Sequence, residues 1–269
     1  MPRVAVYTCS IGGYDWVLKP RVKPDNADFL RFSDRRPIFA RGWSHRSISY
    51  GVSGLSPRLI SRFPKIRPCE VLSDYEIGVW IDSSVEVIGD ITPLLREFEQ
   101  SGSDVALFSH PSRRTVGQEI AYALSVGRIP SQFAERAEQQ RKRYEAMGLL
   151  ERNICECTIL FYRLHSQPLK AASERWWSEL NTFTERDQIS QPYAMEDPSL
   201  KTYVWDWHFG EDNPYFRRVA HRPEGFVKRV RMGAHLFGDS RLDYRVARAF
   251  IKAAGAVRRF GKSLGPTNK

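Results

Sequence analysis

Cysteine and long apolar runs are scarce in this sequence. Its 269 residues include four cysteines, Cys9, Cys69, Cys155 and Cys157. No apolar run approaches the roughly 20 residues that span a bilayer. So few and scattered cysteines exclude a disulfide framework, and Cys155 and Cys157 lack a second ligand pair at zinc spacing. The first residues run straight into a strand pattern, so we expect no cleavable signal peptide and a cytoplasmic globular protein.

Acidic residues are nearly absent from the end of the chain. Residues 241–269 carry eight basic side chains and one acid, Asp243, whereas residues 1–240 contribute only +3 to the net charge of +10. The positive charge therefore does not argue that residues 1–240 bind nucleic acid. Apolar residues recur at three- and four-residue steps in the tail. This pattern predicts a basic amphipathic helix, either on an anionic membrane surface or docked on the domain, and the two interpretations carry equal weight.

A glycine-rich dinucleotide fingerprint is also missing after the first strand. What the sequence does contain is an alternation of apolar strand patterns and helical patterns. The expected strands are 3–9, 28–33, 77–81, 104–109 and 157–162, and the expected helices are 56–63, 91–100, 115–126, 131–147 and 167–180. Beyond Gln188 the pattern is irregular. Alternating strands and helices predict an α/β domain over residues 1–240, with a mostly parallel sheet covered on both faces and ligands at the carboxyl ends of its strands.

One carboxylate lies at the carboxyl end of an expected strand, where ligands bind in such sheets. Asp82 directly follows the apolar strand 77–81, and Ser84 lies on the same side two residues later. Mg²⁺ and Mn²⁺ prefer oxygen ligands and often share them with a diphosphate. An aspartate capping a turn is equally common after a strand. Both interpretations stay open on these residues alone.

Two further candidates have weaker local signals. Asp187, within Arg186-Asp187-Gln188, could accept a proton from an attacking hydroxyl group, although such a pair is more often a helix start or a surface ion pair. His235 and His221 could bind a metal, although a lone histidine in apolar surroundings is more often a core residue.

Seven segments, read in order, together resemble one family. They are Tyr7–Asp15, Phe32–Asp34, Arg62–Pro68, Trp80–Ser84, His110–Arg113, Trp176–Trp177 and Arg186–Ser190. The set resembles the glycosyltransferase-like family long catalogued as a domain of unknown function, which has bacterial and plant mucilage-related members. The resemblance covers about residues 4 to 225. It implies the GT-A fold, a Rossmann-like α/β fold that binds nucleotide sugars.

The resemblance also implies roles for particular residues. The nucleotide sugar would be held by side chains and turns of the following positions: Thr8, Gly12, Gly13, Tyr14, Asp34, Arg62, Lys65, Asp82, Ser83, His110 and Arg113. Asp82 with Ser84 stands where related enzymes carry Asp-x-Asp, so one of the two carboxylates is replaced. His235, or else His221, would complete the shell of a Mn²⁺ or Mg²⁺ ion.

The activity that the resemblance implies is transfer of a sugar from a nucleotide sugar, with UDP as the expected nucleotide, to a glycan or lipid-linked acceptor in surface polysaccharide synthesis. An inverting reaction needs a base, for which Asp187 is the first expectation and Glu156 the second, with Arg186 beside them. A retaining reaction needs none at that position. A non-catalytic nucleotide-sugar-binding or glycan-binding module is the alternative, and Ser84 favours it.

Overall fold

A computed structural model of the protein describes residues 2–36, 42–48, 53–210, 212–219 and 221. The chain divides into two compact units, Met1–Val219 and Ala220–Lys269. The expected tail 241–269 and His235 lie outside the described residues. Among the helices of the described part, none combines the length and the apolar character that crossing a membrane requires.

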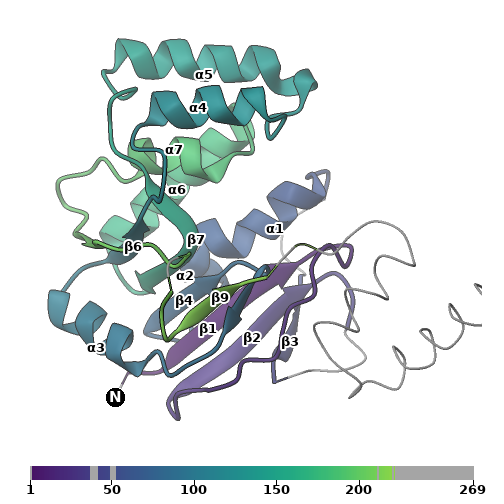
Figure 1. Cartoon of the computed structure of the whole chain (residues 1–269), viewed down its shortest axis with the longest axis vertical. Helices are drawn as coiled ribbons and strands as arrows, with labels where there is room; N and C mark the ends of the chain where they lie inside the picture. The colour runs from purple at the N-terminus through teal and green to yellow at the C-terminus, as the bar shows by residue number, and fades with distance from the viewer. Residues whose placement is uncertain (1, 37–41, 49–52, 211, 220, 222–269) are drawn as a thin grey trace, which may run out of the picture. The chain divides into compact units, whose positions relative to one another are not determined.

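A seven-stranded sheet forms the centre of the first unit (Figure 1). Its strand order is β3-β2-β1-β4-β7-β6-β8, and every neighbouring pair is parallel except the two that involve β7. The strands are β1 (Val4–Ser10), β2 (Ala27–Ser33), β3 (Ser44–Ser47), β4 (Ile77–Ile81), β6 (Val105–Ser109), β7 (Cys155–Arg163) and β8 (Thr202–Trp205). All residues of β1 and β4 are buried, as continuous apolar runs predict for strands covered on both faces.

Helices cover both faces of this sheet. One face packs against α1 (Pro57–Ile66), α6 (Gln167–Thr182) and α7 (Asp187–Ala194), with α2 (Pro68–Val71) joining α1 to β4. The other face packs against α3 (Thr92–Ser101) and a two-stranded sheet of β5 (Val85–Val87) and β9 (Phe216–Arg218). A third cluster joins α4 (Val116–Ser125), the 3₁₀ turn η1 (Ser131–Phe133) and α5 (Ala134–Ala146) to Ile189 of α7. Figure 1 shows α4 and α5 stacked above α7.

Most of the predicted elements are confirmed. Ser56 caps α1 by accepting a hydrogen bond from the Leu59 N–H at 3.1 Å, and the mostly parallel α/β sheet is present. The prediction of irregular structure beyond Gln188 is wrong, because α7 forms there. Its eight residues include Pro192, and so short a helix leaves too few turns for a periodic apolar pattern.

Candidate functional site

Strand ends from the middle of the sheet meet at one edge. β1, β2, β4 and β6 run parallel and finish there, and Asp34, Asp82 and His110 directly follow the last three of them. Because β7 runs the opposite way, its first residues reach the same edge and bring Glu156 there. The predicted residues of the strand ends are therefore gathered along one rim of the sheet.

The Asp82 carboxylate lies among cations. Its Oδ1 accepts a hydrogen bond from Trp80 Nε1 at 2.8 Å and lies 3.6 Å from Lys65 Nζ and 3.9 Å from Arg62 Nη1. Its backbone N–H donates to the Thr158 carbonyl at 2.9 Å, which ties it to β7. A quarter of the side chain is exposed. Asp82 is thus held through one oxygen and remains within reach of a ligand.

Asp187 is a deeply buried carboxylate of the site. It starts α7, and its Oδ2 pairs with Lys65 Nζ and lies 3.5 Å from Arg62 Nε. The side chains of Asp187 and Lys65 are 3% and 1% exposed. Burial alone would raise the pKa of Asp187, but Arg62, Lys65 and Arg186 outweigh it and hold this pKa well below its usual range. Asp187 is therefore a permanently ionised, weakly basic counter-ion.

Glu156 is buried under different conditions. Its Oε1 accepts hydrogen bonds from Arg218 Nη2 at 2.9 Å and Thr158 Oγ1 at 3.2 Å. Its Oε2 is buried and has no hydrogen-bond partner within the described part of the chain. Burial raises the pKa of Glu156 to about 7, Arg218 and Thr158 oppose that rise, and the charge of Asp82 adds to it. A carboxyl group with this pKa can accept a proton near neutral pH.

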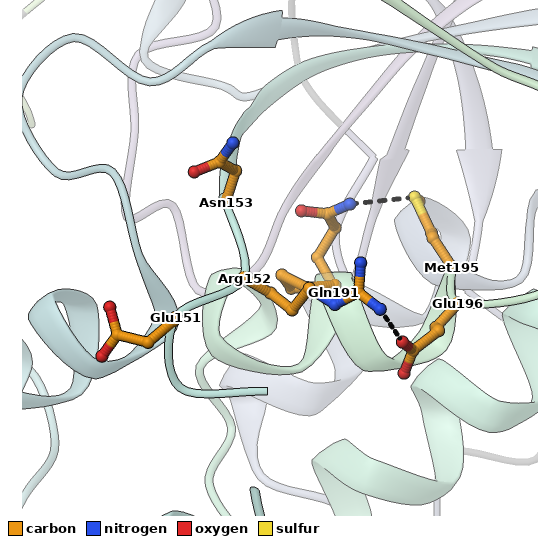
Figure 2. A pocket seen from close by; sticks show the side chains of 7 residues that line it. Glu151, Arg152, Asn153, Gln191, Met195 and Glu196 are labelled. Carbon is orange, nitrogen blue, oxygen red and sulfur yellow. Dashed lines mark hydrogen bonds and ion pairs between the residues drawn. The ribbon is translucent and has the colours of Figure 1, made fainter. Parts of the chain in front are cut away.

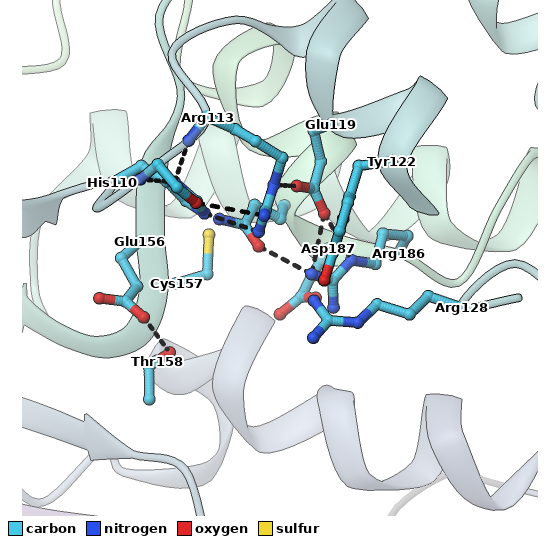
Figure 3. A network of polar contacts seen from close by, with 12 residues as sticks. His110, Arg113, Glu119, Tyr122, Arg128, Glu156, Cys157, Thr158, Arg186 and Asp187 are labelled. Carbon is cyan, nitrogen blue, oxygen red and sulfur yellow. Dashed lines mark hydrogen bonds and ion pairs between the residues drawn. The ribbon is translucent and has the colours of Figure 1, made fainter. Parts of the chain in front are cut away.

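A buried glutamate that the sequence analysis overlooked organises the α4 side of the site (Figure 3). Glu119 of α4 is fully buried; Arg186 Nη2 donates to its Oε1 at 2.8 Å, and Arg113 Nε donates to its Oε2. Arg113 Nη2 also lies 3.0 Å from His110 Nε2. Burial and the charge of Arg113 lower the pKa of His110 to about 4, so this imidazole is neutral. Glu119 therefore fixes two of the predicted site arginines.

The ends of β1 and β2 form a different environment. The Gly12 N–H donates to both Asp34 oxygens, at 3.1 and 3.2 Å, so the turn after β1 is fastened to the end of β2. Gly12 and Gly13 have φ of 60° and 67°, which favours glycine. Tyr14 is 67% exposed beside them. The hydroxyl of Thr8 is buried without a hydrogen-bond partner among the described residues. This corner offers backbone, hydroxyl and aromatic groups to a ligand.

The predicted metal ligands are only partly brought together. Asp82 and Ser84 share the turn after β4, where the Ser84 carbonyl accepts from the Val219 N–H at 2.7 Å, and Ser83 Oγ donates to Asp15. His221 is exposed and belongs to the second unit, and His235 lies outside the described residues. Among the described residues, no three His, Cys, Asp or Glu side chains are grouped as metal ligands.

A hollow of about 470 Å³ lies beside the start of β7 (Figure 2). It is lined by Glu151, Arg152, Asn153, Gln191, Pro192, Met195 and Glu196. Arg152 Nη2 pairs with Glu196 at 2.6 Å across it, and Gln191 Nε2 donates to Met195 Sδ at 3.1 Å. Asp82, Glu156 and Asp187 are not among its lining residues, so the hollow flanks the charged site and does not contain it.

Comparison with known proteins gives one family match. The family model described as "TOD1/MUCI70, glycosyltransferase-like domain" matches residues 55–209. No curated protein matches the sequence.

Several solved structures match the chain at low sequence identity. WbbM, a bifunctional glycosyltransferase, gives a TM-score of 0.52 at 12% identity over 76% of this chain, and this chain covers 39% of WbbM. Mouse xyloside xylosyltransferase 1 gives 0.45 at 9% identity, covering 76% of this chain and 84% of the other. GlyE of Streptococcus pneumoniae TIGR4 gives 0.45 at 11% identity, with coverages of 76% and 45%. At such identities the likeness to WbbM shows the fold alone, a GT-A arrangement with a mostly parallel sheet.

Proposed function

Because the chain belongs to the TOD1/MUCI70 glycosyltransferase-like family, we propose that it transfers a sugar from a nucleotide sugar to an acceptor hydroxyl group at the rim that bears Asp82. Membership supports glycosyl transfer in general, and the charged residues support this location. The observation that carries the proposal is the pair of buried carboxylates flanking Asp82: Asp187 is neutralised by two cations, and Glu156 has a pKa near neutrality. One rim thereby offers both a binding centre and a proton acceptor.

The nucleotide, which we propose to be UDP, occupies the corner formed by the ends of β1 and β2. Its ribose and base would contact Thr8, the turn Gly12–Tyr14 and Asp34. The buried Thr8 hydroxyl without a described partner supports this placement, because buried polar groups normally have a partner. The exposed ring of Tyr14 supplies an apolar surface for a base. The attached sugar then lies toward β4 and Asp82.

A divalent ion fits this arrangement. Mg²⁺ is commonly held by one or two carboxylates together with substrate phosphates, so a single carboxylate is a sufficient protein anchor. Asp82 keeps one oxygen outside the contacts with Trp80, Lys65 and Arg62, and the Ser84 hydroxyl lies two residues further on. We propose that Asp82 and Ser84 hold Mn²⁺ or Mg²⁺. When bound, the ion would neutralise charge on the leaving diphosphate.

Glu156 is our proposed base for the acceptor hydroxyl, in place of Asp187. Proton transfer works best when the pKa of the base is close to the working pH, which fits Glu156 and not Asp187. The acceptor proton would pass to a Glu156 oxygen as the hydroxyl oxygen bonds to the anomeric carbon and the bond to the diphosphate breaks. Asp187 instead keeps Lys65 and Arg62 in place beside Asp82. This assignment makes the transfer inverting.

Thermal-shift measurements with UDP-, GDP- and CMP-sugars, with and without Mn²⁺, test the proposal. We expect a Mn²⁺-dependent stabilisation by a UDP-sugar that Asp82→Asn abolishes and that Asp74→Asn, at an exposed position, preserves. Product NMR should show inversion at the anomeric carbon. Nucleotide-sugar binding without turnover over a broad acceptor panel would instead support a non-catalytic binding module. Absence of any nucleotide-sugar shift would contradict both functions.

A further inference from the structure

The positive charges of the site are not balanced evenly. The net charge around Asp82 is zero, because the two cations Arg62 and Lys65 face the two carboxylates Asp82 and Asp187. An additional anion gains little from a group that is already neutral. The excess of positive charge lies further along the rim, toward α4.

Four arginines lie there near α4 and the start of α7, and we call Arg58, Arg113, Arg128 and Arg186 the arginine cluster. The guanidinium carbons of Arg113 and Arg128 lie 4.1 and 5.2 Å from the centre of the Tyr122 ring. Arg58 Nη1 donates to the Arg128 carbonyl at 3.3 Å. Arg186 shares Glu119 with Arg113 (Figure 3). The four side chains come from α1, from the two loops that flank α4, and from the residue before α7.

Acidic groups do not cancel this charge. Within the described part of the chain, Glu119 is the carboxylate that is bonded to the cluster. Asp187 and Glu185 act on Arg58 through their charges, and Glu185 also accepts a hydrogen bond from Ser56 Oγ at 2.7 Å. Four cations thus face three nearby acids, and one of these acids, Asp187, is also paired with Lys65 and Arg62. Burial lowers the pKa of Arg58, and the charges of Arg62 and Arg186 lower it further. Burial is likewise the first cause of the lowered pKa of His110, and the charge of Arg113 adds to it.

The cluster still has hydrogen-bond donors to offer. The Arg128 side chain is exposed, and its guanidinium group has no polar partner among the described residues. Arg58 donates from one terminal nitrogen to the Arg128 carbonyl, and the other N–H groups of its guanidinium can donate to a ligand. Arginine forks match carboxylate and phosphate oxygens in pairs. Tyr122 and Glu119 already hold the neighbouring arginine side chains in place. Few side chains therefore have to become ordered when an anion binds.

The order of strands separates this cluster from the nucleotide corner. The proposed nucleotide lies at β1 and β2, the transferred sugar at β4, and the cluster beside β6 and α4. An acceptor must approach the sugar from the side opposite its nucleotide, which is the side of the cluster. We infer that the arginine cluster binds an anionic group of the acceptor, a carboxylate or a phosphate carried on a sugar. This inference rests on the proposed function and adds the charge of the acceptor to it.

Calorimetric titration of the full chain tests the inference. The probes are methyl glucuronide, glucose 6-phosphate and neutral methyl glucoside, with UDP as the donor-side probe, at a salt concentration that screens the tail equally in all variants. Arg128→Ala, at an exposed position, and the double variant Arg58→Ala/Arg128→Ala report on the cluster. Arg141→Ala is the matched control, because it removes an α5 arginine paired with Glu138 and Glu145. Circular dichroism confirms that each variant is folded.

We expect an anionic probe to bind more tightly than methyl glucoside. Arg128→Ala should weaken that binding on the order of tenfold, as expected for loss of one charge-assisted hydrogen bond, and the double variant should weaken it further. The affinity for UDP should not change in either variant. Preference for glucuronide or for phosphate identifies which anion the acceptor carries.

Three results would overturn the inference: no preference for the anionic probes, unchanged affinity in the double variant, or an equal loss of UDP affinity. The last result would assign the cluster to the donor diphosphate. Failure of the proposed function is distinguishable, since it would show as absence of UDP-sugar binding in the unmodified chain.

Discussion

The site has a buried carboxylate at each of two edges, and the pKa values of these two groups are shifted in opposite directions. At the edge between α1 and α7, Asp187 is matched by Lys65 and Arg62, and its pKa is held low. At the edge between β7 and β9, Glu156 faces Arg218, whose side chain is 60% exposed, and its pKa rises to about 7. Both carboxylates are almost fully buried. The number and burial of the cationic partners, more than burial of the acid itself, separate a fixed charge from a group that can exchange a proton.

The largest effect should come from removing the proton acceptor. Glu156→Gln should lower kcat by about 10²–10⁴-fold, the usual range for loss of a general base, and should remove the rise of kcat with pH around pH 7. Glu86→Gln is the matched control, because Glu86 is also a buried glutamate that pairs with a β9 arginine, Arg217. Steady-state kinetics, with kcat calculated for the folded fraction of each variant, compare Glu156→Gln with Glu86→Gln. A larger loss in Asp187→Asn, with a wild-type pH profile in Glu156→Gln, would return the base role to Asp187.

The next effect concerns stability at the other edge. Lys65→Met leaves the buried Asp187 with one cation fewer, and breaking such a pair costs about 3–5 kcal/mol. Arg67→Met, close by at the end of α1, removes an arginine paired with Glu70, whose side chain is 40% exposed, and should cost about 0–1 kcal/mol. Urea unfolding of the two variants measures the difference. Equal losses would mean that Lys65 and Asp187 are not coupled as strongly as their burial indicates.

A smaller effect, of opposite sign, should appear in the pH dependence of stability. The folded state raises the pKa of Glu156 from 4.5 to about 7, so it binds the proton more tightly than the unfolded chain, and stability is lost as pH rises between these values. Glu156→Gln should therefore be more stable than the parent by about 1–3 kcal/mol at about pH 8, and not at about pH 4. Asp187 acts the other way: its contribution is present above its ordinary pKa of 3.8 and is lost as pH falls below it. Unfolding curves at both pH values measure this.

Local patterns were sufficient for much of the fold. Apolar runs predicted β1 and β4, and Ser56 followed by Pro57 predicted the start of α1, because these signals lie within a few residues of the elements that they define. The rule of carboxyl strand ends then pointed to Asp82, whereas Asp34 and His110, which lie on the same rim, were named only through the family resemblance. The edge strand β8 was not predicted, since its four residues are too few to show an alternating pattern and only Trp205 among them is buried.

The rest of the site depends on pairings between distant residues. Glu156 reaches the rim only because β7 is antiparallel, so the rule of carboxyl ends, which applies to parallel strands, excludes it. Glu119 bonds to Arg186 across 67 positions, and nothing near Glu119 in the sequence marks it as buried. The low basicity of Asp187 likewise depends on Lys65, 122 positions away. Sequence patterns identified the strand ends, whereas the ionisation of each carboxylate depends on its tertiary neighbours.

The smallest effect should come from removing the exposed arginine that pairs with Glu156. Arg218 favours the ionised form of that carboxylate, so Arg218→Ala should raise the pKa of Glu156 further and move the alkaline rise of kcat upward by less than about one pH unit, because an exposed partner contributes little. Arg217→Ala is the matched control: it removes the preceding β9 residue, whose side chain is 51% exposed and pairs with Glu86. If both variants shift the pH profile equally, the shift reflects overall charge. If neither variant shifts the profile, Arg218 does not contribute to the pKa of the group that titrates during turnover.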